Sequence, residues 1–200
     1  MAFILDETLH PDLFPLAFLV GDWQGTGAIQ LLGADGGETG RRIEQRLSIS
    51  HDGSPQLAWF MQTWVLELPA PVPGREDEPV DPDSVVRELL LKERGRFRTS
   101  GPLPGQDLAR ANAAKPGSPE SFVSHGVSLE IEDGETWLGE VRGPRLQLAA
   151  EEAPHPHRLD ATTFATRMFG MIGSRLMWLQ EIGEDPHSLR AHFSVELDRA

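Results

Sequence analysis

The chain has 200 residues, which suits one domain with a sizeable core. Its 31 Asp and Glu residues outnumber 18 Lys and Arg, and the resulting net charge of −13 argues against nucleic acid or an anionic membrane as a partner. Cys and Tyr are absent, which excludes disulfides, iron–sulfur clusters and thiolate or phenolate iron ligands. No apolar run reaches membrane-spanning length and the N-terminus lacks a signal-peptide pattern, so we expect a cytoplasmic protein.

The N-terminal part combines a short helical turn with a glycine-rich strand. Asp12 is a candidate N-cap for a helix that ends before Gly21. Gly21, Gly25 and Gly27 then share one face of the predicted strand with Trp23. Glycines at this spacing indicate a sharp bend or a close backbone approach, and we interpret them as a barrel corner with Trp23 plugging the end. A phosphate loop is excluded because no Lys-Ser/Thr pair and no helix follow.

Two central stretches show the alternation of a half-buried strand. In residues 41–49 the apolar side chains Ile43, Leu47 and Ile49 share one face, and charged or hydroxyl side chains share the other. In residues 87–98 the same rule places Leu89, Leu91, Glu93 and Phe97 on one face and four basic residues on the other. Both stretches therefore predict strands with one side facing water.

The remaining chain predicts more short strands and little helix. We expect strands at residues 56–66, 127–132, 136–142, 145–150, 162–172, 175–182 and 189–197. Asp133-Gly134 is a tight-turn signal between two of them. Proline-rich insertions are expected at about 69–83 and 102–124, with one or two helical turns in 108–115. The prediction is one all-β domain over 1–200, an antiparallel barrel of about ten strands after a short N-terminal helical turn.

The Gly-x-Trp-x-Gly-x-Gly pattern at 21–27 resembles the nitrobindin family, small haem-binding barrels related in shape to fatty-acid-binding proteins and lipocalins. Residues 91–98 are similar to the family's Glu-x-Gly-aromatic-x-Arg strand, and residues 191–199 to its last strand, which begins with His. The resemblance implies haem b held by His192 as the axial ligand of the iron. It also implies nitric oxide binding and isomerisation of peroxynitrite to nitrate at ferric haem.

The alternation around His192 conflicts with an inward position. Strict alternation places His192 on one face with Arg190, Ser194 and Glu196, and a polar face is normally the outside of a barrel. A bulge near residues 186–191, or a partly polar inner face at the mouth, would reconcile the two readings. The other histidines are weaker candidates: His51, His125, His155, His157 and His187.

Two departures from the family affect the expected chemistry. Leu91 stands where many members have a distal His, and residues 32–40 lack a Pro-Thr segment that many members carry. Leucine donates no hydrogen bond, so the distal pocket should be apolar. A non-enzymatic carrier of a fatty acid or other apolar ligand, and a barrel filled by its own side chains, remain alternatives. No catalytic triad is recognisable, and the oligomeric state, including a homodimer, is left open.

Overall fold

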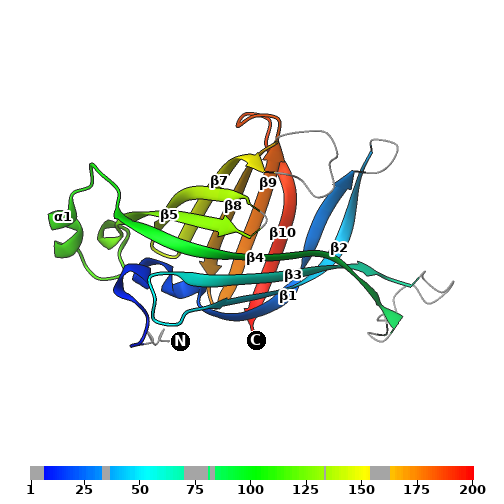
Figure 1. The fold of residues 1–200 in the computed structure, drawn as a ribbon, viewed down its shortest axis with the longest axis horizontal. Coiled ribbons are helices and arrows are strands. Elements are labelled where there is room, and N and C mark those ends of the chain that lie inside the picture. Colours follow the sequence, from blue (N-terminus) through cyan, green and yellow to red (C-terminus); the bar gives the residue numbers. More distant parts are fainter. Residues whose placement is uncertain (1–6, 33–36, 70–80, 82–83, 133, 154–162) are drawn as a thin grey trace.

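The computed structural model describes residues 7–32, 37–69, 81, 84–132, 134–153 and 163–200. Ten strands close into a barrel in the order β1-β10-β9-β8-β7-β6-β5-β4-β3-β2, and all neighbouring strands are antiparallel (Figure 1). The predicted all-β barrel is therefore confirmed. Closure gives every strand a neighbour on each side, and the pairing of β4 with β5 covers residues 95–102 of β4.

The elements have the following bounds, in chain order: η1 (Pro11–Leu19), β1 (Gly21–Leu32), β2 (Glu38–Ser50), β3 (Leu57–Glu67), β4 (Val86–Pro102), α1 (Leu108–Ala113), η3 (Pro119–Ser121), β5 (Ser124–Ile131), β6 (Thr136–Arg142), β7 (Arg145–Ala153), β8 (Thr163–Ile172), β9 (Arg175–Gly183) and β10 (Arg190–Arg199). The helix α1 confirms the helical turn expected after residue 108. The expected insertion at 69–83 lies almost wholly outside the described residues. Within the described part of the chain, no helix is both long and apolar enough to cross a membrane.

The N-terminal helical turn is a 3-10 helix that closes one end of the barrel. The prediction of Asp12 as its cap was wrong, because the His10 side chain accepts the hydrogen bond from the Asp12 amide. Leu13, Leu16 and Leu19 of this helix are completely buried. The indole of Trp23 donates to the Leu19 carbonyl at 2.8 Å, which ties the helix to the start of β1. Trp23 therefore plugs this end, as predicted.

The glycine face of β1 explains the close approach of β10. A Cβ atom at Gly25 or Gly27 would overlap the carbonyl oxygen of Glu196 or Ser194 in that neighbouring strand. Gly21 adopts a φ of +134°, and the Arg199 guanidinium lies beside it, 4.4 Å from the centre of the Trp23 ring. The close backbone approach expected at these glycines is therefore present, and Gly25 and Gly27 allow β1 and β10 to pack together.

The predicted alternation holds in β2 and in most of β4. Ile43, Leu47 and Ile49 are buried, and Glu93 and Phe97 face inward as expected. Leu89 was predicted to face inward but is 52% exposed. The reason is a register shift, in which Thr63 pairs with Leu91 and the next residue, Trp64, pairs with Leu89. The resulting bulge reverses the face of every residue beyond it.

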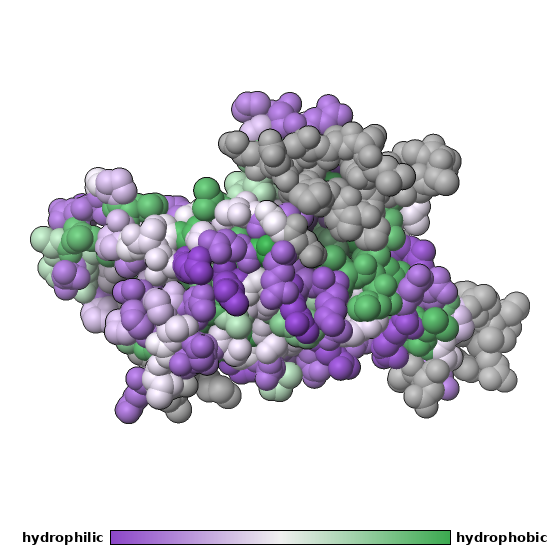
Figure 2. All heavy atoms as spheres, in the orientation of Figure 1, coloured by the Kyte–Doolittle hydropathy of each residue, from purple (hydrophilic) through white to green (hydrophobic). Residues whose placement is uncertain are grey.

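The outside of β2, β3 and β4 carries cations over aromatic rings. Arg46 lies 5.5 Å from the Trp64 ring centre, and Lys92 and Arg94 lie 5.6 and 5.2 Å from the Phe60 ring centre. Figure 2 shows this hydrophilic front face, with a green apolar area toward the free end of the β3–β4 hairpin. The strands therefore have one face in water and one face inside the barrel. Polar side chains are expected on the outer face, so only those on the inner face need an explanation.

Candidate functional site

The barrel interior contains an unusual set of polar side chains. The buried polar or charged residues of the described chain are Gln45, Thr63, Glu93, Arg167, Gln180 and His192. They come from six strands, β2, β3, β4, β8, β9 and β10. Buried polar groups are costly unless they are hydrogen-bonded, so each of them calls for a partner or a function.

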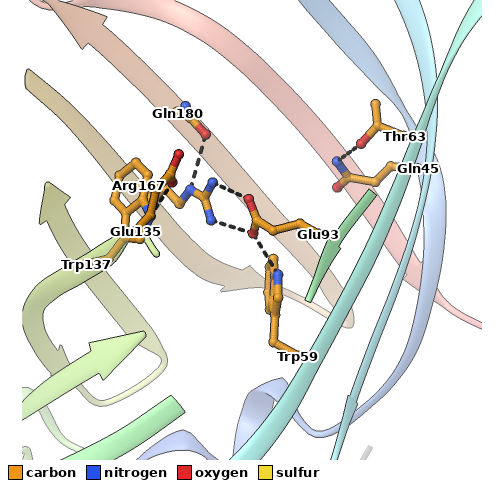
Figure 3. Close-up of polar contacts among 8 residues, drawn as sticks. All are labelled: Gln45, Trp59, Thr63, Glu93, Glu135, Trp137, Arg167 and Gln180. Carbon is orange, nitrogen blue, oxygen red and sulfur yellow. Dashed lines mark hydrogen bonds and ion pairs between the residues drawn. The ribbon is translucent and has the colours of Figure 1, made fainter. Parts of the chain in front are cut away.

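Glu93 and Arg167 form an ion pair across the interior. Two guanidinium nitrogens of Arg167 donate to the two carboxylate oxygens of Glu93, each at 2.7 Å (Figure 3). The Trp59 indole donates to the same carboxylate at 2.7 Å, and the Trp137 ring lies 4.1 Å from the guanidinium carbon. The Arg167 and Glu93 side chains are only 3% and 7% exposed. Because the two charges cancel, the pair leaves this part of the interior electrically neutral.

A second chain of hydrogen bonds crosses from β9 to β3. The Trp178 indole donates to the Gln45 amide oxygen at 2.6 Å, and the Gln45 amide nitrogen donates to the Thr63 hydroxyl at 2.9 Å. An indole N–H is only a donor, so it fixes which way the Gln45 amide points. Thr63 pairs with Leu91, the residue at the expected distal position, and Leu91 packs against the apolar core.

His192 lies at a bulge in β10. Ala191 pairs with Glu181 and Phe193 pairs with Gln180, so His192 is the extra residue between two paired positions. A bulge lets successive side chains share a face, and both His192 and Phe193 are 4% exposed. The two rings meet edge to face with centres 4.7 Å apart, and Phe193 stacks on Trp178 at 5.8 Å. The structure therefore has a bulge of the kind that would reconcile an inward His192 with the alternation, and it buries His192 beside the Phe193 ring.

The other histidines are less suited to hold a ligand inside the barrel. His187 is exposed in the turn before β10, and His51 lies half-buried in the turn after β2. His125 is half-buried in β5, where burial lowers the pKa of its imidazole. His155 and His157 lie outside the described residues. Across the described ranges, no three His, Asp or Glu side chains form a group that could hold a metal ion.

Sequence reasoning missed most of the interior network. The sequence places Arg167 and Gln180 in two expected strands without assigning either a role, yet the alternation around Arg167 carries a signal. Ala165 and Phe169, two residues to either side of it, are both completely buried. An arginine between two inward apolar positions requires an anionic partner inside, and Glu93 is the inward acid that the alternation in β4 had already identified.

This chain is similar to a described domain family, to named proteins of other organisms and to a solved structure. Residues 12–199 match the family described as "THAP4-like, heme-binding beta-barrel domain". A "Ferric nitrobindin-like protein" of Beutenbergia cavernae is 28% identical, with 100% of this chain and 99% of that protein covered. A "Peroxynitrite isomerase" of Leifsonia xyli subsp. xyli is 31% identical, with 96% of each covered. The crystal structure of Rv2717c from M. tuberculosis shares the fold, with a TM-score of 0.55, 19% identity and coverage of 96% and 99%.

Proposed function

Because the chain belongs to the family of THAP4-like, haem-binding β-barrel domains, we propose that it binds haem b through His192 and isomerises peroxynitrite to nitrate. The observation that carries the proposal is the position of His192, buried at the β10 bulge beside the inward Phe193 ring. Two relatives named for peroxynitrite isomerase or ferric nitrobindin match over nearly the whole chain, which supports the same activity.

The residues around His192 fit a haem group. Imidazole is a usual proximal ligand of haem iron, and the sequence offers neither Cys nor Tyr as a competing ligand. The wall beside His192 continues as stacked rings, from Phe193 to Trp178 at 5.8 Å and on to Phe169 at 5.4 Å. An apolar wall of this kind would suit a macrocycle and would keep water away from a bound iron.

The alternative of a fatty-acid carrier is disfavoured by the state of Arg167. An apolar ligand with a carboxylate head group needs a cation or several donors inside the barrel. Arg167 is the only cation among the buried residues that the structure describes, and Glu93 already holds two of its nitrogens. A second carboxylate at Arg167 would have to displace Glu93 or remain unpaired, and either outcome is costly.

The residues of this chain would contribute positioning and a dry site. Ferric haem, when bound, would supply a Lewis-acidic iron for the rearrangement of peroxynitrite to nitrate. The same iron in the ferrous state would bind nitric oxide. His192 would hold the iron from one side, and Leu91 would present an apolar side chain that neither donates nor accepts a proton. The reaction is an isomerisation, so the protein need supply no electrons and no protons in net.

The activity is tested by mixing peroxynitrite with the haemin-loaded protein in a stopped-flow spectrometer. We expect peroxynitrite to decay faster than in buffer and the yield of nitrate over nitrite to rise. Haemin without protein, and protein without haemin, serve as matched controls. Decay no faster than with the same amount of free haemin would contradict the proposed activity.

A further inference from the structure

The outer face of β4 carries a row of cations that the proposed function leaves unexplained. Lys92, Arg94 and Arg96 alternate with inward side chains along this strand, and all three are exposed. We call these three residues the basic ladder; β4 crosses the front of the barrel in Figure 1, on the hydrophilic face shown in Figure 2. The ladder is opposite in sign to the chain as a whole, whose net charge is −13.

The charges of the basic ladder are not cancelled by carboxylates of the barrel. In the described part of the chain, none of its three side chains forms an ion pair. Two acids of this region bind other cations. The Glu44 carboxylate lies 2.8 Å from Nε of Arg87, and the Glu130 carboxylate lies 2.9 Å from Nη1 of Arg98. The ladder is therefore available to an anionic group from outside the barrel.

The surroundings of the basic ladder favour an acidic polypeptide over a nucleic acid or a membrane. Single-stranded nucleic acids stack their bases on aromatic rings, but the Phe60 ring beside the ladder is already engaged by two cations. Lys92 and Arg94 lie over this ring, 5.6 and 5.2 Å from its centre. A membrane or a long nucleic acid would also extend beyond the ladder and meet the net negative charge of the chain. A short acidic segment needs to contact the ladder alone.

We propose that the basic ladder binds an extended segment of another protein that carries Asp or Glu at alternate positions. Every second side chain of an extended segment points the same way, about 7 Å from the next, and the ladder has the same spacing. Three carboxylates can therefore meet the three cations one to one. Each arginine can hold its carboxylate through two parallel N–H donors. This surface lies on the outside of the barrel and does not depend on the proposed haem function.

Two synthetic peptides of the same composition and charge test the spacing. One has the sequence Glu-Ser-Glu-Ser-Glu-Ser, and the other has its three glutamates in a row, Glu-Glu-Glu-Ser-Ser-Ser. Each is titrated at low ionic strength into the isotope-labelled 200-residue chain, and the shifts of the backbone amide signals give the dissociation constant and the contact surface. We expect the alternating peptide to bind at least about threefold more tightly, with the largest shifts along β4, because one more carboxylate reaches the ladder.

A matched pair of variants separates the ladder from the overall charge. Arg94→Gln together with Arg96→Gln removes two cations of the ladder. Arg110→Gln together with Lys115→Gln removes two exposed cations in and after α1, so the net charge changes by the same amount. We expect the first variant to weaken the alternating peptide about fivefold or more and the second to leave it unchanged. If circular dichroism shows that the first variant is unfolded, Lys92→Gln carries the same prediction in direction.

Four results would overturn the proposal. The first is equal affinity of the two peptides, or binding of neither. The second is an equal loss in the two variants, which would show that only the overall charge matters. The third is tighter binding of a single-stranded oligothymidylate of equal charge, which would make the partner a nucleic acid. The fourth is binding to phosphatidylserine vesicles that the ladder variant loses, which would make it a membrane surface.

Discussion

The two ends of β10 differ in the contacts that their side chains make. At its last residues the Arg199 guanidinium covers Trp23 and donates to the Val20 carbonyl, and the Trp23 indole donates to Leu19. Near its start lie the bulge at His192 and the adjoining Gln180, whose amide oxygen accepts from Nε of Arg167. At the closed end, the Trp23 indole and the Arg199 guanidinium both donate hydrogen bonds to backbone carbonyls, and their rings and chains fill the space. The His192 end instead buries His192, Gln180 and the Glu93–Arg167 pair, and a few polar side chains within an apolar surrounding are typical of a ligand site.

The largest loss of stability should come from breaking the buried ion pair between Arg167 and Glu93, whose arginine contacts Gln180. Arg167→Met leaves the Glu93 carboxylate buried without its partner, so the free energy of unfolding should fall by about 3–5 kcal/mol. Urea denaturation followed by tryptophan fluorescence measures this. Arg98→Met is the control, because its pair with Glu130 is exposed on the surface and should cost about 0–1 kcal/mol. Similar losses in the two variants would contradict the role assigned to the buried pair.

A smaller loss is expected from crowding the strand contact near the closed end. In Gly25→Ala the new Cβ meets the backbone of Glu196 and Leu197, which cannot move aside as a side chain would. We expect about 1–3 kcal/mol less stability in the same urea experiment. Gly40→Ala is the matched variant, because its Cβ would lie at ordinary contact distance, 3.4 Å or more, from the flexible Gln30 side chain. A destabilised Gly40→Ala with a normal Gly25→Ala would reverse our interpretation of the motif.

The smallest effect concerns His125, which lies near the start of β5 and pairs with Val141 of β6. Burial lowers its pKa, so the unfolded chain takes up a proton more readily than the folded one as pH falls through the ordinary histidine value of about 6.5. This histidine therefore costs stability at acidic pH and costs nothing once pH is well above that value. His125→Asn should lose less unfolding free energy than wild type between about pH 8 and pH 5. Parallel pH profiles would show that His125 does not contribute.

The barrel could be predicted from the sequence because its signals are local. Alternation in residues 41–49 and the glycine turns fix strands and their inner faces without knowledge of the partners. Leu89 and His192 could not be placed, since each depends on a bulge that is decided by the pairing of two strands. The network had the same limitation, because Glu93 and Arg167 are 74 residues apart and only the closed barrel brings them together.

Removal and chemical replacement of the His192 imidazole tests the central claim most directly. Wild-type protein should shift the Soret band of haemin away from its position in free haemin, and His192→Gly should not. Added imidazole should restore the shifted band because it replaces the missing side chain as iron ligand. His187→Gly, which removes an exposed histidine five residues earlier, should behave like wild type. A His192→Gly protein that keeps wild-type haemin affinity and spectrum without imidazole would contradict the account.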